Sequence, residues 1–156
     1  MQPIEPKTFA LITAKEIVEA APIKAAASIR LGNRPPGFDE KAKLLARAIV
    51  ILLLLQKVQK NPASGPVLKE FERTFLPPTM EEGQGMFTTL RAEMAAFNRL
   101  ITERKELRWS AEWLAAAGIE LTDPASLAQF AQGWMVFYVE TAKAIDKYQP
   151  ADAAKN

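Results

Sequence analysis

The sequence predicts an all-α protein, a single-domain irregular helical bundle of five to seven helices with no sheet. Apolar residues in the long segments recur at intervals of three and four, which is the spacing of one face of a helix. No run alternates apolar and polar residues over the length of a strand. Proline and glycine divide the chain into helix-sized pieces. Its 156 residues fit one domain over 1–150, followed by a loose C-terminal tail over 151–156.

Proline residues delimit the helices of the first half. A helix is expected over 6–21, and Pro22 ends it and begins a short successor. The stretch 32–37 holds two prolines and two glycines and cannot be helical. Asp39 is the expected N-cap of a long helix over 39–60. Because the middle of that helix is apolar on every side, we expect it to cross the centre of the fold.

The second half is divided in the same way. A short helix is expected over 67–76, between two loops that contain proline. After a glycine-containing stretch, one long helix is expected over 86–117, with a kink at Ser110. Gly118 has the place of a glycine that ends a helix in a Schellman motif. The last helix is expected over 123–148, since Thr-Asp-Pro precedes it and a proline closes it.

The chain contains no histidine and no cysteine. This removes the imidazole as a proton carrier, the thiolate as a nucleophile, and the common ligands of zinc, copper and iron–sulfur clusters. The carboxylate pairs lie in charged surroundings typical of solvated helix faces, and no phosphate-binding glycine motif occurs. The sequence therefore predicts a protein that is not an enzyme and that needs neither a metal nor a cofactor.

Positive charge gathers in the segment 24–60. It carries eight basic residues against two acidic ones, whereas 61–123 carries seven against ten. Such a segment could line a groove for nucleic-acid phosphates, with Phe38 available for base stacking. The alternative is that these charges are solvated helix ends. The candidate nucleic-acid-binding residues are Arg30, Arg34, Lys41, Lys43 and Arg47.

Aromatic residues gather in the last third of the chain. The apolar face of the 123–148 helix covers more than half of its circumference, which is wider than one neighbouring helix can bury. Aromatic anchors dominate protein interfaces, but burial inside the bundle accounts for the same pattern. The candidate protein-interface residues are Trp109, Trp113, Trp134, Tyr138 and Tyr148.

No segment of the sequence predicts a membrane span or a secretory signal. The longest apolar run, 48–55, would extend about 12 Å as a helix, against a hydrocarbon thickness of about 30 Å. The amino terminus lacks the basic and apolar regions of a signal peptide. We therefore expect no contact with a membrane and an intracellular location, in the cytoplasm or within a virion or an intracellular complex.

These observations favour a non-catalytic structural or interaction subunit of a larger macromolecular assembly. Its expected partners are other protein subunits, in a homo- or hetero-oligomer. The alternative is a sequence-independent nucleic-acid-binding subunit of a ribonucleoprotein or viral packaging complex, which would bind through the segment 24–60.

Overall fold

The computed structural model describes residues 3–60, 65–75, 80–147 and 149–150. Helices hold 82% of these residues, so the predicted all-α bundle is confirmed. The elements in chain order are β1 (Pro3–Ile4), α1 (Pro6–Ile12), the π-helical segment η1 (Thr13–Val18), α2 (Ala21–Ser28), α3 (Phe38–Lys60), α4 (Gly65–Phe75), α5 (Met80–Glu103), α6 (Glu106–Ala116), α7 (Pro124–Lys147) and β2 (Gln149–Pro150).

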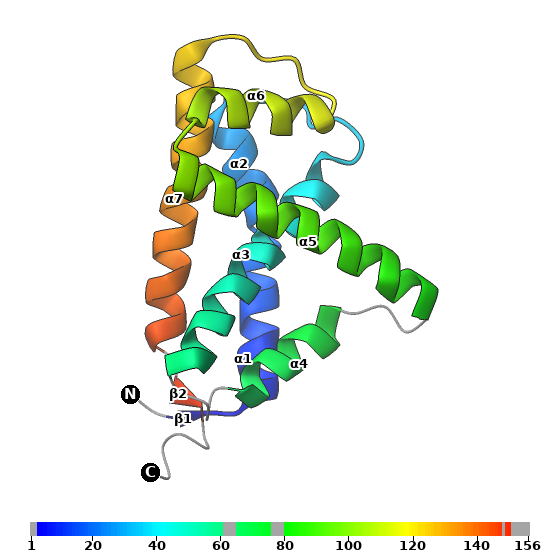
Figure 1. The fold of residues 1–156 in the computed structure, drawn as a ribbon, viewed down its shortest axis with the longest axis vertical. Coiled ribbons are helices and arrows are strands. Elements are labelled where there is room, and N and C mark those ends of the chain that lie inside the picture. Colours follow the sequence, from blue (N-terminus) through cyan, green and yellow to red (C-terminus); the bar gives the residue numbers. More distant parts are fainter. Residues whose placement is uncertain (1–2, 61–64, 76–79, 148, 151–156) are drawn as a thin grey trace.

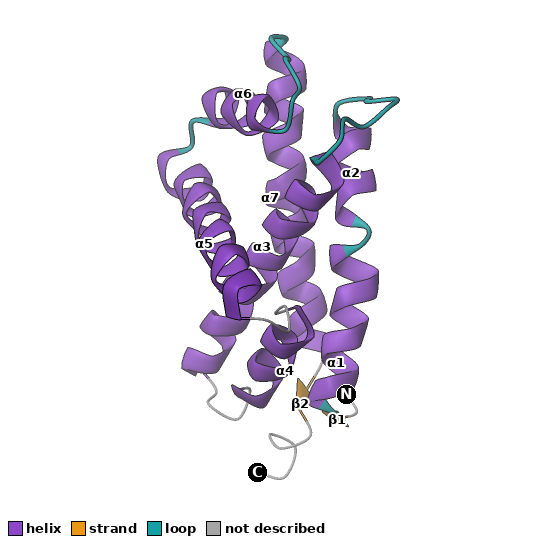
Figure 2. Cartoon of the chain, turned by 90° about the vertical axis from the view of Figure 1, so that its right-hand side faces the viewer, coloured by secondary structure: helices purple, strands orange, loops and turns teal. Residues whose placement is uncertain are grey.

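The helix α3 lies at the centre of the bundle, as its sequence predicts. It contacts α2, α4, α5 and α7, with α5 on one side of it and α1 and α2 on the other (Figure 2). Residues 48–51 of α3 are all buried. Because four consecutive residues point to all sides of a helix, neighbouring elements must surround α3 completely at this level.

The strands β1 and β2 form a parallel pair of two residues each. Pro3 lies opposite Gln149 and Ile4 opposite Pro150, so the two ends of the described domain lie side by side (Figure 1). Strands of two residues are too short to show an alternation of apolar and polar residues, so the sequence pattern could not predict this pair.

The first expected helix, 6–21, is not a uniform α-helix. It is α-helical to Ile12 and then π-helical through η1. The next helix, α2, begins with proline in its first turn, as predicted. It ends in a Schellman motif, in which Leu31 N donates to Ala26 O at 2.9 Å and the residue before it, Arg30, has a φ of 55°.

The prediction that Asp39 is the N-cap of α3 is wrong. The helix begins at Phe38, one residue earlier than predicted, and Gly37 precedes it with a φ of 87°. Asp39 therefore lies in the first turn, where its carboxylate pairs with Arg34 Nε at 2.6 Å. The ion pair ties the preceding loop to α3.

The prediction of a single helix over 86–117 is also wrong. The helix α5 begins earlier, at Met80, and the chain breaks at Arg104 rather than bending at Ser110. Arg104 has a φ of 58°, and its Nε is 2.8 Å from Glu106 Oε1 across the break. This turn folds α6 back against α5.

Two expected helix ends are confirmed. At the end of α6, Ile119 N donates to Leu114 O at 2.9 Å and Gly118 has a φ of 88°, which is a Schellman motif. At the start of α7, Asp123 Oδ2 accepts a hydrogen bond from Ser126 N at 3.0 Å. The Ser126 hydroxyl also donates to this oxygen, and its hydrogen bond together with the backbone one lowers the pKa of Asp123.

Candidate binding groove

A groove with a volume of about 700 Å³ lies between α7 and the column formed by η1 and α2. The two sides run antiparallel (Figure 1), and Ser28 of α2 lies opposite Gly133 of α7. On α7 the lining extends from Gln129 to Ala144, which is about 22 Å along a helix axis. The groove is long enough for an extended molecule.

Small residues on one side and aromatic rings on the other shape this groove. Ala21 and Ala25 line it from α2, and Phe130, Trp134 and Phe137 line it from α7. The centroids of the Trp134 and Phe137 rings are 5.4 Å apart, edge to face. The lining is therefore mainly apolar.

One buried polar atom beside the groove has no hydrogen-bond partner. The side chain of Trp134 is 3% exposed, and no acceptor is within reach of its Nε1. A buried donor without an acceptor costs about 1–3 kcal/mol. Few such groups occur in folded proteins, and each one calls for a physical reason.

The charged residues that line the groove separate along its length. Lys24 and Arg30 come from α2 and its C-terminal turn, whereas Glu16 and Glu140 lie towards the opposite end. Arg30 is exposed and stands where glycine is the usual residue, because its φ is positive.

The five basic residues predicted to bind nucleic acid have different surroundings in the structure. Lys41 Nζ is 2.6 Å from Glu93 Oε1 and 4.8 Å from the centre of the Trp113 ring. Arg30 lines the groove instead.

Two of the other three candidates are near carboxylates of the chain, and the third is partly buried. Arg34 pairs with Asp39, and Lys43 Nζ is 4.0 Å from Glu40 Oε1. Burial lowers the pKa of Arg47. Phosphate binding by these side chains would have to compete with the carboxylates, and it stays a prediction.

The aromatic residues predicted to form an interface are placed mostly inside the chain. Trp109, Trp113 and Trp134 are all less than 9% exposed, so their rings anchor the core. Tyr138 is half-buried, with its ring 5.3 Å from that of Phe97 and its hydroxyl 3.4 Å from Gln56 Nε2. Tyr148 lies outside the described residues.

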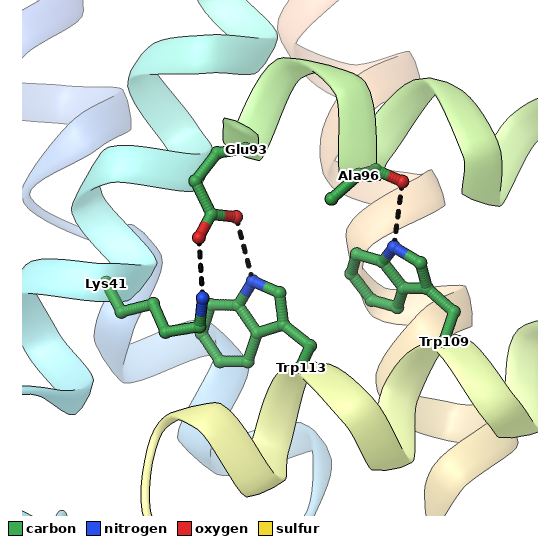
Figure 3. A network of polar contacts seen from close by, with 5 residues as sticks. All are labelled: Lys41, Glu93, Ala96, Trp109 and Trp113. Atoms are coloured by element: carbon green, nitrogen blue, oxygen red, sulfur yellow. Dashed lines mark hydrogen bonds and ion pairs between the residues drawn. The ribbon is translucent and has the colours of Figure 1, made fainter. Parts of the chain in front are cut away.

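A buried polar network joins α3, α5 and α6 (Figure 3). Its centre is Glu93, a charged residue of α5 that is only 5% exposed. One carboxylate oxygen accepts from Lys41 Nζ at 2.6 Å and the other from Trp113 Nε1 at 3.0 Å. Trp109 Nε1 donates to Ala96 O at 2.9 Å. All the polar groups of this network are satisfied by the chain, so it holds the fold together.

Two further observations concern the described part of the chain. No group of three acidic side chains there is placed to hold a metal ion. No described helix has an apolar stretch long enough to cross a bilayer.

Comparisons with protein-family models, with curated proteins and with solved structures find no match to this chain. The candidate site therefore depends on geometry alone.

Sequence reasoning missed the groove as a whole. Its two sides come from residues 16–30 and 129–144, which are far apart in the chain. The one available signal was Gly133, a glycine inside a long helical pattern, where a packing or functional reason is usual.

Proposed function

We propose that this chain is a non-catalytic α-helical binding subunit and that the groove between α2 and α7 holds its ligand. One observation carries the proposal, the groove itself. Its volume of about 700 Å³ falls within the range of about 300–1,000 Å³ typical of ligand sites. Its mainly apolar lining with a few polar groups is also typical of such sites, and bundles hold ligands between facing helices.

The second part of the proposal is that the chain acts within a larger assembly. Val136 and Val139 are each 48% exposed and lie one turn apart on α7. Val136 lines the groove, so this strip would bring a protein partner next to the ligand. The other exposed large aliphatic side chains among the described residues lie on separate helices.

The ligand site can be tested by titration with anilinonaphthalene sulfonate, whose fluorescence rises in apolar sites. We expect saturable binding of one molecule per chain. Gly133→Leu places a side chain where Gly133 lines the groove and should weaken binding about tenfold or more, which corresponds to about 1.4 kcal/mol.

Ala128→Leu is the matched control. Ala128 is exposed on the same helix and does not line the groove, so this variant should bind the dye like the original protein. Equal binding by both variants, or no saturable binding by any of them, would exclude the groove as a ligand site.

Assembly can be tested by native mass spectrometry of the protein isolated from its own cells. The expected result is a complex with another protein chain that survives high salt, because apolar contacts are not screened. Val139→Glu should release the partner, whereas Leu107→Glu, on the separate helix α6, should not. A bare monomer would contradict this part of the proposal, and bound nucleic acid would favour the alternative function.

A further inference from the structure

The groove between α7 and the column formed by η1 and α2 is open to solvent along its length. Several residues of α7 both line it and are exposed, namely Gln129, Gln132, Gly133, Val136 and Glu140. A molecule in the groove would therefore keep one face in water and pack the other against the mainly apolar lining. Such a site fits an amphipathic occupant, because a wholly apolar molecule would leave part of its own surface exposed.

Exposed aliphatic side chains continue the apolar surface beyond both sides of the groove. Ile23 of α2 is 62% exposed and lies one turn before Ala27, which lines the groove. On α7, Val139 lies one turn after Val136. Because α2 and α7 are in contact, their axes are about 8–10 Å apart. A third helix, about 10–12 Å across with its side chains, would contact both sides.

The lining also favours a helical occupant over an extended peptide. It is mainly apolar, and the backbone groups within α2 and α7 are already hydrogen-bonded in their own helices. An extended peptide would therefore leave its backbone N–H and C=O groups unpaired against the lining, whereas a helix pairs them internally. The length of about 22 Å along α7 corresponds to about fifteen residues, or four turns, of such a helix.

The charged residues of the groove define one end of the occupant. Glu16 of η1 and Glu140 of α7 line the same end. Among the described residues Glu16 forms no ion pair, and Glu140 is 3.8 Å from Lys143 Nζ. A basic group of the occupant belongs at this end, since Lys24 and Arg30 would repel it further along α2.

The basic end also gives the direction of the occupant helix. Cations are favoured in the last turn of a helix, beside its partial negative charge. A helix whose last turn is basic would therefore end at Glu16 and Glu140, and it would run in the same direction as α7.

We propose that the groove between α2 and α7 binds an amphipathic helix of a partner protein. The apolar face of this helix packs between α2 and α7, and its basic last turn lies at Glu16 and Glu140. The inference rests on the proposed function, since it names the ligand class of the same groove. It makes the ligand and the protein partner of that function one molecule.

Two designed peptides with the same apolar face test this inference. Each has about fifteen residues, with alanine and leucine at intervals of three and four and glutamine elsewhere. A lactam bridge on the outer face keeps it helical, because a free peptide of this length is only marginally so. The cationic peptide ends in a turn with two lysines, and the anionic peptide has two glutamates there.

Fluorescence anisotropy of the labelled peptides, titrated with the full chain, measures their affinity. We expect saturable binding of one cationic peptide per chain. The anionic peptide should bind at least about tenfold more weakly, because its last turn meets the two carboxylates.

Charge reversal locates the basic end. Replacing Glu16 and Glu140 together with lysine should invert the preference, so that the anionic peptide binds more tightly. The matched control replaces Glu103 and Glu120 with lysine, since both are exposed and lie outside the groove lining, and it should leave the preference unchanged. Equal affinity of the two peptides, or a preference that survives reversal at Glu16 and Glu140, would overturn the proposal.

Two further variants place the peptide in the groove. Gly133→Leu obstructs it from α7, and Ala27→Gln obstructs it from α2 at an exposed position. Both should weaken binding of the cationic peptide about tenfold or more, and circular dichroism checks that each variant is folded. The control Ala128→Leu should bind like the original protein. Unchanged affinity of both groove variants would overturn the proposal.

The outcomes separate this inference from the proposed function. If anilinonaphthalene sulfonate binds and Gly133→Leu weakens its binding, but neither peptide binds, the groove is a ligand site and its ligand is not a helix. If neither the dye nor a peptide binds, both proposals are wrong. If light scattering shows a dimer that the cationic peptide dissociates, the occupant is a second copy of the chain, and the partner helix is wrong.

Discussion

Tryptophans on α6 and α7 share one aromatic cluster but differ in their polar partners. The ring of Phe130 lies 5.4 Å from that of Trp113 and 6.3 Å from those of Trp109 and Trp134. On α6 both indole N–H groups donate to α5, whereas on α7 the indole N–H has no acceptor. The indole N–H groups are thus satisfied on α6 and unsatisfied on α7.

The difference follows from what each tryptophan faces. The turn at Arg104 folds α6 against α5, where Glu93 supplies a carboxylate. Trp134 instead faces α2, whose buried residues are alanine and proline. Such small residues leave space for a ligand.

The largest expected effect is at the buried Glu93 network. Glu93→Ala removes the acceptor shared by Lys41 and Trp113, so the free energy of unfolding should fall by about 3 kcal/mol. Glu112→Ala breaks only the exposed pair with Arg108 and should cost less than about 0.5 kcal/mol. Chemical denaturation of both variants checks this. Similar losses would mean that the Glu93 network does not stabilise the core.

A direct comparison of the two sides replaces each tryptophan with phenylalanine. Both variants lose similar ring area, but Trp113→Phe also leaves a buried oxygen of Glu93 without its donor. Trp113→Phe should therefore cost about 1–2 kcal/mol more than Trp134→Phe. Urea unfolding measures the difference. Equal costs would show that Trp134 Nε1 has a hidden partner in the free protein.

The groove should tolerate a small addition. Gly133→Ala should raise the free energy of unfolding by about 0.5–1 kcal/mol, because alanine favours the helix. Its added Cβ would lie 3.5 Å from Ser28 Cβ, an ordinary contact. Thermal unfolding provides the measurement. A loss of stability would mean that α2 lies too close to α7 at Gly133 for an added methyl group.

The smallest expected effect concerns the cation at the groove. Arg30→Gly should raise the free energy of unfolding by about 0.5 kcal/mol, since relief of the positive φ outweighs the added freedom of the unfolded chain. Gly118→Ala is the matched control at the equivalent position after α6 and should destabilise by about 1 kcal/mol. Calorimetry compares them. A destabilised Arg30→Gly would mean that the Arg30 side chain already stabilises the empty protein.

The sequence alone determined the helical class, the central position of α3 and several helix ends. These features depend on local signals. Apolar residues on all sides predict burial of α3, Asp123 caps α7 through a residue three positions away, and Gly118 provides a positive φ where α6 ends.

Only the tertiary structure decided the break at Arg104, the burial of Glu93 and the groove. Periodicity shows which face of a helix is apolar, but not which neighbour covers it. Glu93 follows its partner Lys41 by 52 residues, so its solvent-like position in the pattern of α5 contained no sign of that ion pair. The groove likewise joins α2 to α7, and whether the Trp134 N–H meets an acceptor depends on which residues of α2 lie opposite, a matter of three-dimensional packing.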